Sequence, residues 1–130
     1  MNKLLRMLLL VMFWNVPGWG RAQAADLATA QKQFNKYCAK CHGADGRADG
    51  EQAATLNHKP KDWTNCAETA KESDEDLFKV TKLGGQPIQG QRSEMMGMGK
   101  ALSDDEIRGL VAFIRSFCQR QPTAAKETLP

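Results

Sequence analysis

The sequence has little net charge, few histidines and no long apolar run. Of its 18 basic residues, three (Lys3, Arg6 and Arg21) lie among the first 24 residues, which leaves fifteen basic against fifteen acidic residues in the rest. The basic isoelectric point of the whole chain therefore does not indicate binding to nucleic acid or to an anionic membrane. The apolar run from Leu4 to Trp14 is also too short to span a bilayer, which takes about 20 residues.

The first 24 residues have the plan of a secretory signal peptide. A basic start and the apolar run are followed by a Pro17-Gly18 break and by the small residues of Ala22-Gln23-Ala24. We expect cleavage before Ala25 and export; an uncleaved membrane anchor is the alternative. The remaining length suits one small domain, over residues 25–118, and the polar segment 119–130 is expected to be a flexible tail.

Four cysteines and two histidines are few, yet three of these six residues lie together in Cys38-Ala39-Lys40-Cys41-His42. This C-x-x-C-H pattern is the attachment signature of c-type haem. Residues three and four apart share one face of a helical turn, so the two thiols and the imidazole can converge. Both cysteines can then form thioethers with one porphyrin while His42 ligates the iron.

Two other sites would use the same residue types. A thioredoxin-like dithiol needs a strand before the motif, whereas residues 28–37 are polar and helical in period. A zinc site needs a second ligand pair, and the only other candidates are His58, Cys66 and Cys118, which have no matching spacing. Both alternatives are therefore weaker than haem attachment.

From Cys38 to Arg47, and again from Met95 to Ile107, the sequence resembles the small class I monohaem c-type cytochromes of the bacterial periplasm. The resemblance covers nearly the whole chain after the leader. It implies an all-α fold in which the N- and C-terminal helices cross and one covalent haem c is buried in the core. It also implies a periplasmic electron carrier that is not an enzyme and has no catalytic residues. Its partners would be periplasmic dehydrogenases, oxidases or reductases that dock transiently, with no nucleic acid and no membrane span after leader removal.

The apolar spacing predicts three helices. The first covers Asp26–Tyr37, with Ala30 and Phe34 on its apolar face, and the resemblance implies that these two residues meet the last helix. A second follows an N-cap at Ser73 and stops at Gly84-Gly85. The last follows a capping box that begins at Ser103, with a short helical turn at residues 53–56 between the first two.

A low-spin electron-transfer iron needs a sixth ligand, and the glycine-rich segment 86–100 holds Met95, Met96 and Met98. In the resembled family the ligand methionine stands seven residues before the leucine that precedes the serine cap. Counting back from Leu102 gives Met95, with Met96 as its rival and Met98 as a packing residue. His58 is the alternative axial imidazole.

The resemblance further implies that a proline carbonyl, here that of Pro60, accepts a hydrogen bond from the proximal His42. Trp63 is expected to be an apolar wall of the site. Cys66 and Cys118 are left over, and in an oxidising compartment they form either a disulfide or two free thiols. Two further functions stay open: a haem enzyme or gas sensor with a displaceable sixth ligand, and a subunit bound permanently to a periplasmic dehydrogenase or oxidase.

Overall fold

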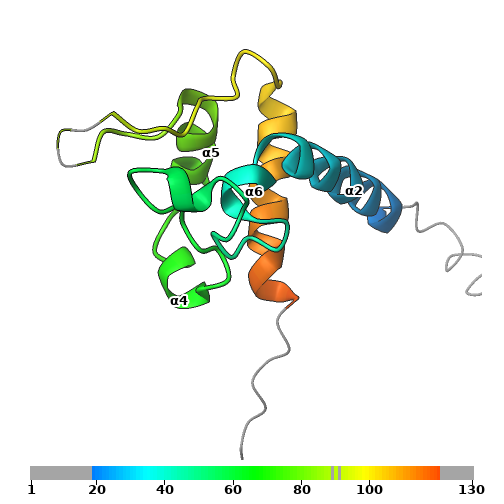
Figure 1. Ribbon diagram of the computed structural model, residues 1–130. Coiled ribbons are helices and arrows are strands. Elements are labelled where there is room, and N and C mark those ends of the chain that lie inside the picture. Colours follow the sequence, from blue (N-terminus) through cyan, green and yellow to red (C-terminus); the bar gives the residue numbers. More distant parts are fainter. Residues whose placement is uncertain (1–18, 89, 91, 121–130) are drawn as a thin grey trace, which may run out of the picture.

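The computed structural model describes residues 19–88, 90 and 92–120, and the elements named within them are all helices, joined by loops and turns (Figure 1). Most of the predicted leader (1–18) and most of the predicted tail (121–130) lie outside the described residues. The elements, in chain order, are α2 (Trp19–Tyr37), α3 (Ala39–His42), the 3-10 helix η1 (Ala53–Thr55), α4 (Cys66–Thr69), α5 (Asp74–Leu83) and α6 (Asp104–Gln119). Within the described part of the chain, no helix has both the length and the apolar character needed to cross a membrane.

The first and last long helices, α2 and α6, cross and pack against each other, as predicted (Figure 1). Ala30 and Phe34 of α2 are buried at this crossing, and a side chain added at Gly109 of α6 would meet the Ala30 methyl group at 3.8 Å. The Phe34 ring packs against the rings of Phe113 and Phe117, with centroids 5.2 and 5.4 Å away. An aromatic cluster therefore holds the two ends of the domain together.

The helix α2 begins at Trp19, earlier than the expected start at Asp26. The additional turns contain Ala22, Ala24 and Ala25, and alanine is the strongest helix former. The start at Asp26 was predicted from the spacing of apolar residues, and this spacing shows only which face of a helix is buried. It therefore gave no signal for the turns before Asp26. They lie within or next to the predicted leader.

The helices α5 and α6 begin at the caps that the sequence predicts. The Ser73 hydroxyl accepts a hydrogen bond from the Asp76 backbone at 3.1 Å, and Gly84 ends α5. The capping box of α6 is complete, because the Ser103 backbone also donates to the Glu106 carboxylate at 2.8 Å. These caps fix where the segment between α5 and α6 starts and ends.

Candidate haem site

The C-x-x-C-H motif forms the short helix α3, directly after α2. The Cys38 backbone still donates to the Phe34 carbonyl at 2.8 Å, and the His42 backbone donates to the Cys38 carbonyl at 2.9 Å. One helical turn therefore carries both thiols and the imidazole. Cys38 and Cys41 are free thiols and half-buried, whereas His42 is buried. Gly50 lets the following loop pass directly against the carbonyls of Ala39 and Lys40, where any side chain would clash.

The chemistry of the Cys38 thiol does not suit a dithiol redox centre. Burial, together with the nearby Cys41, raises the pKa of Cys38 to about 11. Redox-active C-x-x-C pairs depend on a lowered thiol pKa, and they follow a strand rather than a helix such as α2. The zinc alternative also lacks support, because the described residues contain no cluster of three or more His, Cys, Asp or Glu side chains that could hold a metal.

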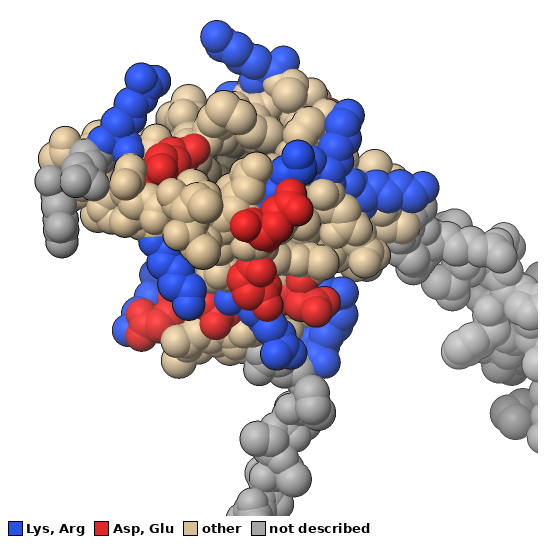
Figure 2. All heavy atoms as spheres, viewed as in Figure 1, with Lys and Arg blue, Asp and Glu red and all other residues tan. Residues whose placement is uncertain are grey.

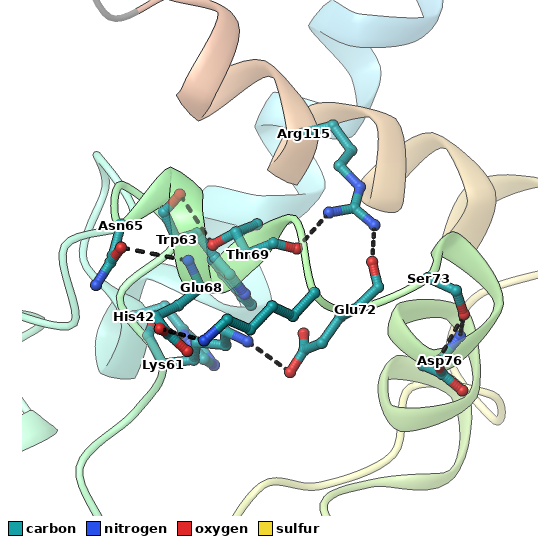
Figure 3. Close-up of polar contacts among 11 residues, drawn as sticks. His42, Lys61, Trp63, Asn65, Glu68, Thr69, Glu72, Ser73, Asp76 and Arg115 are labelled. Atoms are coloured by element: carbon teal, nitrogen blue, oxygen red, sulfur yellow. Dashed lines mark hydrogen bonds and ion pairs between the residues drawn. The ribbon is translucent and has the colours of Figure 1, made fainter.

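The His42 ring is held on two sides. Its Nδ1 lies 3.4 Å from the Lys61 carbonyl oxygen, and its face stacks on Trp63, with ring centroids 4.0 Å apart and planes 10° apart (Figure 3). Burial lowers the pKa of His42, and the hydrogen bond to Lys61 opposes this shift only in part. The imidazole is therefore neutral at neutral pH, the form that can ligate a metal.

The carbonyl that faces His42 belongs to Lys61, so the expectation of Pro60 was wrong by one residue. The Lys61 side chain explains why this residue is fixed, since its ammonium lies 2.5 Å from the Glu72 carboxylate. Lys61 thus contributes its backbone to the site and its side chain to the support of the loop. The expectation for Trp63 agrees with the structure, because its buried indole forms an apolar wall beside His42.

Arg115 of α6 supports the same loop from the other side (Figure 3). Its guanidinium donates to the backbone carbonyls of Thr69 and Glu72 at 2.7 and 2.5 Å, and to the Asp74 carboxylate at 2.8 Å. Arg115 could not be identified from the sequence, because these partners are more than forty residues away in the chain. The one signal in the sequence was that Arg115 is a basic residue at the edge of the apolar stripe of the last helix.

Cys66 and Cys118, for which the sequence left two states open, are joined by a disulfide in the structure, with their Cα atoms 5.5 Å apart. Cys66 begins α4, and the Asn65 side chain caps this helix by accepting from the Glu68 backbone at 3.3 Å. The disulfide therefore attaches the loop that holds Trp63 to the C-terminal end of α6.

The segment between α5 and α6 carries the three methionines and runs close along the end of α5. Gly84 and Met96 form an isolated antiparallel bridge. A side chain at Gly97 would lie 2.5 Å from the Leu83 carbonyl carbon and 2.6 Å from the Lys82 oxygen, so only glycine fits there. Close backbone contact thus sets the position of Met95 and Met96.

The three methionines differ in their surroundings. Met95 is half-buried, whereas Met96 is 76% exposed and Met98 packs against the hydrophobic core. Met95 and Met96 line a groove of about 820 Å³ whose walls come entirely from residues 82–100. The groove walls do not include Cys38, Cys41 or His42. His58, the alternative ligand, is half-buried in the loop after η1, and its Nδ1 has no hydrogen-bond partner within the described residues.

Comparison with known proteins identifies similar sequences and structures. The profile of the family described as "Cytochrome c" matches residues 17–117. Among solved structures, the c-type cytochrome KustC0563 is similar at 25% identity with a TM-score of 0.54, over 68% of this chain and 95% of its own. A search of curated proteins found no match. The range matched by the family profile contains both the C-x-x-C-H motif and the methionine segment.

Proposed function

The chain belongs to the cytochrome c family, whose members bind c-type haem covalently, and from this premise we propose that it carries one electron on a single haem with His42 and Met95 as axial ligands. Cys38 and Cys41 would hold the haem through thioethers. When bound, haem supplies one-electron exchange between ferric and ferrous iron. The observation that carries the proposal is the pair of free thiols on one helical turn with a buried imidazole.

The surroundings of His42 suit a metal ligand. An Nδ1–H donated to the Lys61 carbonyl leaves the lone pair of Nε2 free for iron, and such a hydrogen bond also raises ligand basicity. Trp63 excludes water from one face of the ring. The neutral imidazole, the two thiols and the apolar wall together fit a covalently attached haem.

The different exposure of the methionines supports Met95 as the sixth ligand. A thioether that ligates iron must turn inward, and Met95 is half-buried while Met96 is 76% exposed. Met98 is already used in core packing. Methionine opposite histidine raises the reduction potential and fills the sixth position, which favours electron transfer over catalysis.

We propose that the protein is exported to the periplasm and docks transiently with larger redox proteins rather than acting as an enzyme. A disulfide is typical of oxidising compartments, and the Cys66–Cys118 bond supports export. Acidic and basic side chains are interspersed on the face shown in Figure 2, although basic ones project along its upper edge. Lys61 and Lys82 are paired with Glu72 and Asp104. We therefore expect a small docking interface with a modest dependence on salt.

Absorption spectra of the matured protein test the ligand assignment. The wild type should show the long-wavelength sulfur-to-iron band of the ferric protein, and its ferrous form should ignore carbon monoxide. Met95→Ala should lose both properties, while Met96→Ala and His58→Ala should keep them. A wild type that binds carbon monoxide readily would refute His/Met ligation, and loss of the band only in Met96→Ala would move the ligand by one residue.

A further inference from the structure

Glu94, the residue before Met95, reaches across to the loop that follows η1. Its carboxylate accepts hydrogen bonds from the Asn57 backbone at 2.8 Å and from the Asn57 side-chain amide at 3.3 Å. The two residues are 37 positions apart in the chain. One carboxylate therefore holds one asparagine at two points, and hydrogen bonds to a charged acceptor are stronger than neutral ones.

The backbone–backbone hydrogen bonds that join the Met95 segment to earlier parts of the chain lie on the side of α5. The Gly85 backbone donates to the Met95 carbonyl at 3.0 Å, and the Met98 and Gly99 backbones donate to Thr81 and Lys82 of α5 at 2.8 and 3.0 Å. Met95 thus lies between two attachments: α5 on one side and Asn57 on the other. Neither Asn57 nor Glu94 is buried, so their contact does not serve core packing.

We infer that Asn57 and Glu94 form a latch that keeps the Met95 thioether in its ligand position. This inference rests on the proposed function, because it assumes that Met95 is the axial ligand. A ligand methionine on a loop exchanges between a bound and a released arrangement, and any contact present only in the bound one shifts the balance toward it. The latch is such a contact. Asn57 and Glu94 are positioning residues that act through Met95, since neither is itself placed on the iron.

The size of the effect follows from the strength of the contact. A hydrogen bond to a charged group is stronger than one between neutral groups, and exposure to solvent reduces its contribution. We expect loss of the latch to raise the released population of Met95 about tenfold, which corresponds to about 1.4 kcal/mol. Loss of the side-chain amide alone should raise it about threefold, because the backbone N–H of Asn57 still donates.

Carbon monoxide reports this population, because it binds ferrous iron only while the methionine is released. The experiment measures the rate of carbon monoxide binding to the reduced, matured protein by stopped-flow absorbance. Glu94→Ala should accelerate binding about tenfold and Asn57→Ala about threefold. Glu51→Ala is the matched control, since it removes an exposed carboxylate outside the latch and should bind at the wild-type rate. The double variant should bind carbon monoxide at the same rate as Glu94→Ala alone, because loss of the Glu94 carboxylate already removes both hydrogen bonds from Asn57.

The outcomes distinguish failure of the latch from failure of the proposed His/Met ligation. Wild-type rates in both Glu94→Ala and Asn57→Ala would overturn the latch while leaving His/Met ligation intact. Rapid binding by the wild type would instead overturn the ligation. Equal acceleration by Glu51→Ala would show a charge effect and would also overturn the latch. Asn57→Ala keeps the backbone contact, so it tests the idea even where Glu94→Ala disturbs folding.

Discussion

Removal of the Cys66–Cys118 disulfide should lower the free energy of unfolding by about 4 kcal/mol. The bonded residues are 52 positions apart. For a loop of that length, the chain-entropy relation gives about 14 cal/mol/K, or about 4 kcal/mol at 25 °C. The proposed thioethers at Cys38 and Cys41 lie before this loop and do not shorten it in the unfolded chain. The disulfide therefore acts at full loop length, and its loss removes a large share of a typical stability of about 5 to 15 kcal/mol.

Urea unfolding followed by circular dichroism measures this loss on three samples of the matured protein, all with the haem iron kept ferrous. They are the wild type with its disulfide intact, the wild type after reduction of the disulfide, and the variant with both Cys66→Ser and Cys118→Ser. The reduced wild type keeps the sulfur atoms, so it separates the cross-link from the effect of the serine hydroxyls. Both altered samples should unfold at a lower urea midpoint and with a steeper dependence on urea, because the unfolded chain is less compact without the cross-link.

A loss below about 1 kcal/mol in both samples would refute this reasoning, because it would mean that the unfolded chain is already restrained without the bond. A loss confined to the serine variant would attribute the effect to the hydroxyl groups instead.

Three further predictions concern the helices and the methionine segment. Gly109→Ala should raise stability by up to about 1 kcal/mol in urea unfolding, because the new methyl group makes ordinary contact with Ala30 and alanine favours the helix. Gly97→Ala should instead cost about 1 to 3 kcal/mol and weaken the sulfur-to-iron band, since its methyl group would clash with the backbone of Lys82 and Leu83. Hydrogen bonds from Ser103 lower the pKa of Glu106, so their contribution to stability is complete above the ordinary glutamate pKa and is lost as pH falls through the lowered one. Glu106→Gln, which can still form the capping box, should therefore flatten the acid limb of the stability profile measured by urea midpoints; an unchanged limb would contradict this.

The features that the sequence predicted well are those encoded by neighbouring residues. A capping box, a glycine stop and a C-x-x-C-H turn each depend on residues within about four positions of one another, so Ser103, Gly84 and His42 could be placed from the sequence. The crossing at Ala30 and Phe34 was also expected, from the resemblance to the family. The buried face of each helix followed from its apolar spacing.

The features that escaped prediction depend on contacts between distant segments. Lys61 replaces Pro60 as the acceptor for His42 and its side chain pairs with Glu72, and nothing in residues 58–63 encodes either contact. Arg115 and the Asn57–Glu94 contact likewise join segments about 40 positions apart. The helix α4 has only four residues, too few to show a period. The exposure of the methionines, which supports the proposal of Met95 made from sequence register, is likewise a property that only the folded chain gives.

The stack of His42 on Trp63 limits how far this protein can be re-engineered. Trp63 also packs near Phe34 and Phe117, with centroids 5.8 and 6.4 Å away, so one indole lies against both His42 and the helix crossing. A designer who repacks α2 against α6 would therefore also tilt the ring that is proposed to ligate the iron. Packing at the helix crossing and the orientation of the His42 ring therefore cannot be changed independently of each other.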